Sequence, residues 1–259
     1  MAMTEAPARD DVAPRRPRRA RPSVVGILGE LLITAGVLVL LFLGWQLWLN
    51  DIIVGAEAHA QAVEQTKEWD RAAPPPSEDV PDEPPVAVAP GNDQKFGQIL
   101  VPRFGADFYR QIAEGVSTRT VLNKGFFGHY PSTQMPGAVG NFAIAAHRMA
   151  YGGGLSKIAE LRVGDHVFIE TADGWYQYEF RNLEYVKPTG VGVIDPVPQV
   201  TGVAPGDRLL TLTSCNPKYT AAERIIAYNV FDRFYPRDPT KPASGAPDEI
   251  ATTVAGGAS

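Results

Sequence analysis

An apolar run long enough to cross a membrane is the feature that most limits how this chain can fold. Residues Val24 to Leu49 are interrupted only by Glu30, Thr34 and Gln46. A helix of this length spans roughly 39 Å, more than the hydrocarbon core of a bilayer. A cleaved signal peptide is the alternative, but the run is too long for an ordinary h-region and no clear cleavage site follows it directly. We therefore expect residues 24–49 to be a single uncleaved transmembrane anchor.

Charge differs sharply between the two sides of this run. Six arginines lie within residues 1–23, whereas the segment just after the run carries Asp51, Glu57, Glu64 and Glu68. Because basic flanks stay on the cytoplasmic side, we expect a basic cytoplasmic tail and an extracellular remainder of the chain. The net charge of −5 argues against nucleic-acid binding, since the basic residues concentrate in the tail. That tail could instead bind anionic membrane lipid.

Composition divides the exported part into four segments. Residues 50–72 are rich in Ala, Glu and Gln without a sustained apolar stripe, which is compatible with a solvated helical stalk. Residues 73–95 form a Pro- and acid-rich linker that cannot bury a core. Residues 96–236 have the usual size of one domain. Residues 237–259 resemble the linker in composition, and we expect a disordered tail there.

The expected domain shows the period-two apolar pattern of a mainly β protein. Residues 166–171 and 175–180 flank an Ala-Asp-Gly turn, which predicts a β-hairpin. Residues 208–214 and 224–231 are two further apolar, β-branched runs. Helical signals are short, at residues 107–113 and 156–161. Many short strands with Gly and Pro turns predict a barrel or a sandwich.

The chain contains one cysteine, Cys215, at the end of an apolar strand. An exported protein with one cysteine cannot form an internal disulfide, so the thiol is either buried and inert or free for chemistry. Arg224 begins the next strand, and its guanidinium would face the thiol if the two strands are neighbours. There it could stabilise an oxyanion, and a surface ion pair with Glu223 is the alternative.

A catalytic thiol needs a base or a cation nearby, so the histidines are candidates for this role. His147 ends the apolar strand 141–146, where a scaffold can present a catalytic side chain. A satisfied structural histidine is the alternative at this position. His59 lies in the expected stalk, and His166 is expected to be a solvent-facing strand residue.

Several short motifs, in order along the domain, resemble those of the sortase family. They are Thr211-Leu212-Thr213-Ser214-Cys215 followed by Arg224, His147 within residues 145–148, and segments 99–105, 128–133 and 140–142. Gly128-His129-Tyr130-Pro131 and residues 215–219, with the N-terminal anchor, are most similar to class E, the housekeeping sortases of actinobacteria. The resemblance implies a closed β-barrel of about eight strands with short helices, preceded by the transmembrane helix.

The resemblance also implies a cysteine transpeptidase that acts on a C-terminal sorting signal of the LPxTG or LAxTG type. Cys215 would attack the Thr–Gly carbonyl, His147 would protonate the leaving amine, and Arg224 would hold the substrate and the oxyanion. An amine of a lipid-linked peptidoglycan precursor would then resolve the acyl-enzyme. The implied partners are exported proteins with sorting signals, the wall precursor and membrane lipid, and no cofactor is implied.

Four further residues are expected in the substrate groove. His129 and Tyr130 match the class motif, and Thr213 and Ser214 directly precede the cysteine. Tyr130 could set the preference at the second position of the sorting signal, and a core aromatic is the alternative. Ser214 stands where threonine is usual and Ala146 where glycine is common, which leaves the roles intact.

Rival functions follow from the same residues. A pilin-polymerising sortase usually carries a lid and a C-terminal anchor, and neither is evident. A thiol protease would release a hydrolysed product, and a non-catalytic wall-binding module on a stalk would not need Cys215. Residues 188–207, where some sortases bind calcium, offer only Asp195 and Asp207, so no metal site is expected.

Overall fold

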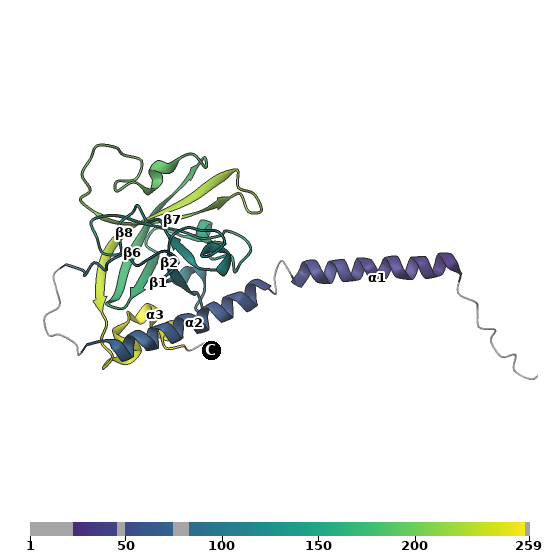
Figure 1. Ribbon diagram of the computed structural model, residues 1–259, viewed down its shortest axis with the longest axis horizontal. Helices are drawn as coiled ribbons and strands as arrows, with labels where there is room; N and C mark the ends of the chain where they lie inside the picture. Colours follow the sequence, from purple (N-terminus) through teal and green to yellow (C-terminus); the bar gives the residue numbers. More distant parts are fainter. Residues whose placement is uncertain (1–22, 46–49, 75–82, 257–259) are drawn as a thin grey trace, which may run out of the picture. The chain divides into compact units, whose positions relative to one another are not determined.

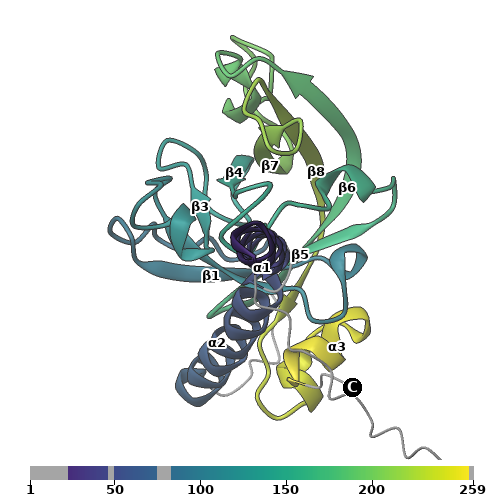
Figure 2. The same cartoon turned by 90° about the vertical axis from the view of Figure 1, so that its right-hand side faces the viewer.

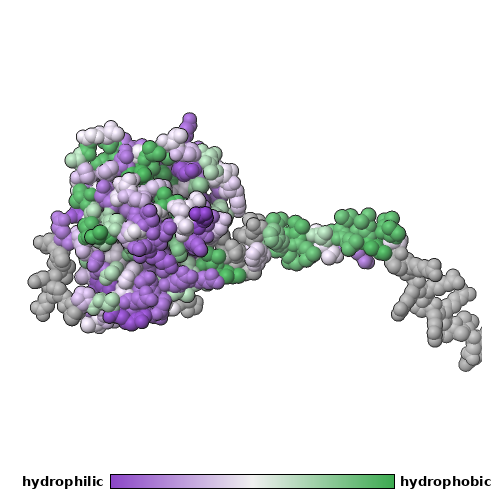
Figure 3. Space-filling view, viewed as in Figure 1, coloured by the Kyte–Doolittle hydropathy of each residue, from purple (hydrophilic) through white to green (hydrophobic). Residues whose placement is uncertain are grey.

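The computed structural model describes residues 23–45, 50–74 and 83–256, in two compact units, residues 1–44 and 45–259. The first unit contains helix α1 (Val24–Gly44), in which no residue is buried. Apolar residues make up most of the face of α1 seen in Figure 3. Helix α1 has 21 residues and a mean hydropathy of 2.5 over an 18-residue stretch, so it is long and apolar enough to cross a membrane, a test that a signal sequence also passes. The expected basic tail and residues 46–49 of the expected anchor lie outside the described residues.

Eight strands of the second unit form a closed barrel (Figures 1 and 2). They are β1 (Lys95–Leu100), β2 (Tyr109–Glu114), β3 (Phe127–His129), β4 (Gly140–Ala145), β5 (His166–Thr171), β6 (Gly174–Val186), β7 (Arg208–Asn216) and β8 (Glu223–Pro236). Around the barrel they follow the order β1-β2-β3-β4-β7-β8-β6-β5, and β5 pairs with β1 to close it. The pairs β2–β3 and β4–β7 are parallel, and the other pairs are antiparallel. The predicted closed barrel and the predicted β5–β6 hairpin are confirmed.

The inside of the barrel is filled by alternate side chains of its strands. Ile99, Ile112, Ile169, Leu212 and Ile225 are completely buried in one continuous cluster. Each such side chain contributes about 1.5–3 kcal/mol through removal of its apolar surface from water. This core fixes the strands that end at the site described below.

Residues 109–114 form strand β2, so the short helix expected at residues 107–113 is wrong. All six residues of β2 are buried, including Arg110 and Gln111. A strand covered on both faces lacks the alternation of apolar and polar residues that identifies strands in sequences. The second helical signal corresponds to a short 3-10 helix, η4 (Ile158–Glu160).

Residues 50–72 are helical, as α2 (Asn50–Ala72), but the expectation of a solvated stalk is wrong. The helix packs on the outside of the barrel, where Ala62, Val63 and Thr66 are buried (Figure 1). Gln98 Nε2 of β1 donates to the Ala62 carbonyl over 3.0 Å, and Thr66 Oγ1 donates to Glu170 Oε2 of β5 over 3.0 Å. Because small residues and polar bonds make this contact, the helix needs no broad apolar stripe.

The segment after β8 is ordered against the barrel, which corrects the expectation of a disordered tail. The Arg237 side chain is 2% exposed, and η6 (Pro242–Gly245) and α3 (Asp248–Val254) follow it. Ile250 and Val254 pack into a buried cluster with α2, and His166, half-buried, contacts Glu249 of α3 at 2.6 Å. The barrel wall supplies the burial that the composition of this segment cannot supply alone.

The end of the expected linker is also held on the barrel. The Pro85 carbonyl accepts a hydrogen bond from the Tyr176 hydroxyl over 2.8 Å. Glu83 forms an ion pair with Arg208. Residues 75–82 of that linker lie outside the described residues.

Candidate active site

The register of β7 and β8 places Cys215 opposite Arg224. The two strands are antiparallel, and these residues are Cα partners near the end of the ladder. Successive side chains of a strand point to opposite faces. Because Leu212 and Ile225 lie in the core, Cys215 and Arg224 both lie on the outer face. The prediction that neighbouring strands bring the thiol and the guanidinium together is confirmed.

His147 is brought beside Cys215 by the parallel pairing of β4 with β7. The last register pair of these strands is Ala145 with Thr213, and His147 and Cys215 each follow two residues later. Beyond that pair, the amide of Ala146 donates to the Thr213 carbonyl over 3.2 Å. The two chains therefore remain adjacent where the strands end, and both side chains are presented at one rim of the barrel.

One groove is lined by all three side chains expected to be catalytic, Cys215, His147 and Arg224. The groove holds about 620 Å³ of empty space, including its open mouth. The Cys215 thiol is free and partly exposed, unlike the buried, inert thiol considered as an alternative. The remaining lining residues are Val116, Thr118, Leu122, Tyr130, Ala145, Ala146, Thr213 and Ser214.

Two side chains hold the imidazole of His147. Its Nε2 lies 2.8 Å from Asn123 Oδ1, so Nε2–H donates and Nδ1 keeps a free lone pair. The ring of Tyr151 lies against the imidazole, with centroids 5.2 Å apart and planes tilted by 31°. Partial burial lowers the pKa of His147 below its ordinary value, which favours the neutral ring.

The guanidinium of Arg224 is held at the rim by backbone carbonyls. Its Nη1 donates to the carbonyls of Ala221 and Glu223 over 3.1 and 3.0 Å. Within the described residues it forms no ion pair with Glu223, whose carboxylate accepts from Asn216 Nδ2 over 3.0 Å. Its remaining N–H groups are therefore available to a substrate carbonyl in the groove.

Arg148, next to His147, is a site residue that no pattern in the sequence indicated. It is 7% exposed and donates through Nη1 to Asn216 Oδ1 over 2.8 Å and to the Cys215 carbonyl over 3.4 Å. This buried cation joins the loop after β4 to the end of β7.

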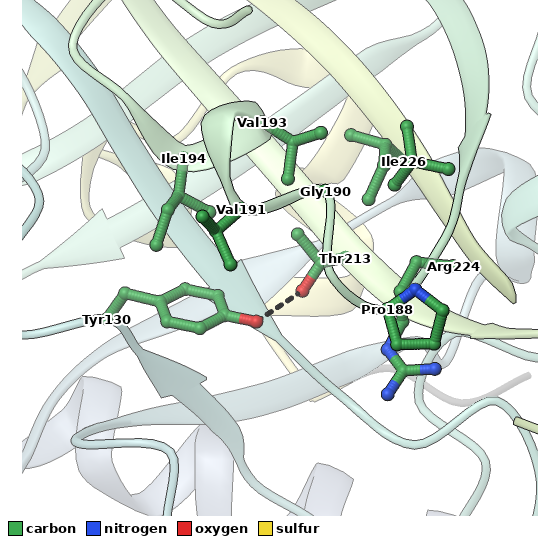
Figure 4. Close-up of a pocket in the computed structure, with 10 residues that line it drawn as sticks. Tyr130, Pro188, Gly190, Val191, Val193, Ile194, Thr213, Arg224 and Ile226 are labelled. Carbon is green, nitrogen blue, oxygen red and sulfur yellow. Dashed lines mark hydrogen bonds between the residues drawn. The ribbon is translucent and has the colours of Figure 1, made fainter.

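A second pocket, walled largely by aliphatic side chains, continues from the groove (Figure 4). It shares Tyr130, Thr213 and Arg224 with the groove, and the connection between β6 and β7 forms its wall. The wall residues are Val186, Pro188, Gly190, Val191, Val193 and Ile194, with Ile226 from β8. Asn141 Nδ2 of β4 donates to the Val193 and Asp195 carbonyls over 3.3 and 3.0 Å and so fixes this wall.

Three of the four residues expected in the substrate groove line it. The Tyr130 hydroxyl lies 3.0 Å from Thr213 Oγ1 at the junction of the two pockets (Figure 4). Ser214 also lines the groove, and its hydroxyl donates to the Ala146 carbonyl over 2.8 Å. Tyr130 and Thr213 are thus positioned to contact a ligand, whereas Ser214 also ties β7 to β4.

His129 lies in the interior, so its expected place in the groove is wrong. The residue is completely buried, with Nδ1 2.7 Å from Glu114 Oε2 and Nε2 3.1 Å from the Gln134 carbonyl. Its ring packs on Phe142, with centroids 5.1 Å apart. Alternation along β3 turns His129 inward, beside Phe127 and away from Tyr130.

Comparison with known proteins assigns the family. A family model described as the Sortase domain matches residues 99–231. The chain belongs to the sortase family. It is 34% identical to Sortase SrtE1 of Streptomyces coelicolor over 89% of this chain and 65% of that protein. Sortase SrtE2 of the same organism is 30% identical, over 83% and 84% of the two chains. This sortase therefore spans slightly less than two thirds of the length of SrtE1.

Solved sortase structures share the fold. The SrtA sortase from Actinomyces oris matches with a TM-score of 0.60 and 34% identity, covering 65% of this chain and 94% of that one. Sortase E1 from Streptomyces coelicolor, solved with a tripeptide in its active site, matches with a TM-score of 0.55 and 34% identity over 63% and 99%. The resemblance to class E sortases is confirmed.

Proposed function

We propose that this sortase is a membrane-anchored cysteine transpeptidase. It cleaves the Thr–Gly bond of an LPxTG- or LAxTG-like sorting signal and joins the acyl fragment to an amine of a lipid-linked peptidoglycan precursor. The observation that carries the proposal is the groove in which Cys215, His147 and Arg224 meet at three strand ends. Helix α1 is the anchor in this proposal, with a cytoplasmic N-terminus and an extracellular barrel.

The first half of the reaction forms a thioester. Neutral His147 takes the thiol proton as Cys215 Sγ attacks the threonine carbonyl carbon, and the N–H groups of Arg224 stabilise the resulting oxyanion. The C–N bond then breaks, and protonated His147 transfers its proton to the leaving glycine amine. Because Asn123 accepts from Nε2, the transferred proton is the one on Nδ1.

The second half reverses these roles with a different amine. Neutral His147 takes a proton from the incoming amine as its nitrogen attacks the thioester carbonyl. The C–S bond breaks, a new amide forms, and the Cys215 sulfur leaves as thiolate. The low pKa that burial gives His147 suits this base step. The bond energy of the original amide is kept in the thioester, so no nucleotide is consumed.

The pocket in Figure 4 suits the apolar start of a sorting signal. Its valine and isoleucine wall would receive the leucine side chain, and Tyr130 would lie beside the second residue of the signal. The thiol lies further along the connected groove, where the threonine carbonyl would be placed.

A transfer assay with the full-length chain tests the proposal. The protein, in detergent, receives LPxTG and LAxTG peptides with and without an amine acceptor. We expect ligated product that requires the amine and disappears in Cys215→Ala and His147→Ala. Hydrolysis that is insensitive to the amine would instead indicate a thiol protease, and unchanged turnover in Cys215→Ala would overturn the proposal.

A further inference from the structure

Two glycine turns lie directly behind the groups that hold His147. Gly125 follows η3 (Leu122–Lys124), which carries Asn123, and Gly152 follows Tyr151. Their φ angles are +80° and +83°, a conformation that favours glycine. Both turns therefore combine a left-handed backbone with the absence of a side chain, which allows another group to approach closely.

The group that approaches is Val54, in the first turns of α2. A Cβ built on Gly152 would lie 2.9 Å from Val54 Cγ1, and one built on Gly125 would lie 3.6 Å from the same methyl. A Cβ built on Gly125 would also lie 3.1 Å from the Tyr151 carbonyl oxygen, so the two turns are adjacent. The valine methyl thus occupies a notch shared by both turns.

Helix α2 is itself fixed to the barrel beside this notch. His59 Nδ1 lies 2.9 Å from the Asp107 carbonyl, and the Arg110 guanidinium lies against Gly55. One helical turn after His59, Ala62 is completely buried on the barrel wall. Val54 is therefore carried by a helix whose position the barrel determines.

We propose that Val54 is a positioning residue for His147. It supports the two turns from behind, so that Asn123 and Tyr151 hold the imidazole at the groove. Val54 lies ten residues after Gly44, the last residue of α1, so the segment next to the proposed anchor sets the geometry of the proton-transfer group. This inference rests on the proposed function, because it assigns His147 the proton transfer.

The full-length chain in lipid nanodiscs tests the inference with matched variants. Val54→Ala removes the supporting methyls, and Val54→Ile retains them. Val63→Ala is the control, because Val63 lies on the same helix but packs near Gly256 at the C-terminal end. For Val54→Ala we expect kcat to fall roughly three- to tenfold with an unchanged peptide KM. Val54→Ile and Val63→Ala should keep the wild-type kcat.

A second readout does not depend on turnover. The imidazole ¹⁵N resonances of His147, assigned by their loss in His147→Ala, should shift in Val54→Ala and stay in place in Val63→Ala. Unchanged His147 resonances in Val54→Ala, or an equal fall in kcat in Val63→Ala, would overturn the inference. If the wild-type chain transfers no peptide, the proposed function fails, and the resonances still decide whether Val54 positions His147.

Discussion

A buried ionic network around Arg237 holds α2, the barrel and the C-terminal segment together. The arginine contacts the carboxylates of Glu170 in β5 and Asp70 in α2, and the Glu170 side chain is completely buried. Its Nη2 also donates to the Thr171 carbonyl over 2.8 Å, and its guanidinium lies 4.6 Å from the ring centroid of Trp175. Three segments of the chain therefore depend on one cation.

Replacing Arg237 by methionine should destabilise the protein strongly. Methionine keeps most of the volume but leaves the Glu170 charge buried without a cation, which costs about 3–5 kcal/mol. For a unit of this size, that loss lowers Tm by roughly 6–20 °C. The double variant Glu170→Gln/Arg237→Met removes both charges and should recover much of the loss, because a buried pair is often replaceable by neutral groups.

The same network predicts how stability depends on pH. Burial raises the pKa of Glu170 from 4.5 to about 7, although Arg237 and Thr66 oppose the rise. The folded state then binds more protons than the unfolded state between these values, so the contribution of Glu170 is greatest below about pH 4.5 and is lost as pH rises towards about 7. The difference amounts to about 3 kcal/mol. Arg237→Met removes an interaction that lowers this pKa, so its deficit should grow with pH.

These changes in stability are measured by thermal and denaturant unfolding of the full chain in detergent. Unfolding is followed by circular dichroism at about pH 5 and about pH 8. Comparison of wild type with Glu170→Gln isolates the Glu170 contribution from other carboxylates. Arg233→Met is the control, since Arg233 lies four residues earlier, in β8, and is exposed. A Tm for Arg237→Met within about 2 °C of wild type at the higher pH would refute the reasoning, as would a double variant no more stable than the single one.

Three further predictions concern the site. Asn123→Asp places a carboxylate beside His147 and should raise the pKa of the imidazole. The acidic side of the pH–rate profile for transfer should then move about one pH unit upward, and an unmoved profile would contradict the hydrogen bond. Tyr130→Phe removes the hydroxyl contact with Thr213 and should raise the peptide KM roughly two- to tenfold in steady-state assays, with kcat retained. Arg148→Ala leaves the turn at Cys215 without its buried donor and should lower kcat by roughly tenfold or more. The assay is run well below the measured Tm of the variant, and an unchanged kcat would contradict this role of Arg148.

The main parts of the site could be predicted because they lie at strand ends. The apolar runs before His147 and Cys215 and after Arg224 identify three strands, and an antiparallel pair places two of these residues in register. The parallel pairing of β4 with β7 joins segments far apart in the sequence, which no local pattern specifies. Only the resemblance to sortases indicated that His147 would join the other two.

Residues whose role depends on a distant partner could not be predicted. Asn123 lies in a short polar turn, and its function is visible only from the 2.8 Å contact with His147. His129 was expected in the groove because, with Tyr130, it matches the class motif, but the direction of a strand side chain depends on register that the motif does not contain. The strand pattern of β2 was obscured because a helix from outside the expected domain packs on this strand, so that its polar residues are buried as well as its apolar ones.

The folded unit includes segments before and after the barrel because one outer face of the barrel is apolar. Leu100, Tyr109, Phe168 and Trp175 point outward, yet each is at most 1% exposed beneath α2 and the C-terminal segment. Strands that are apolar on both faces require a covering layer. That layer consists of residues 50–72 and 237–256, although their composition suggests spacers. These segments need few apolar residues because the barrel face provides most of the apolar surface in the contact. The barrel and its cover should therefore unfold as one cooperative unit, and helix α2, which is bonded to β1 and β5, has a fixed position relative to the groove.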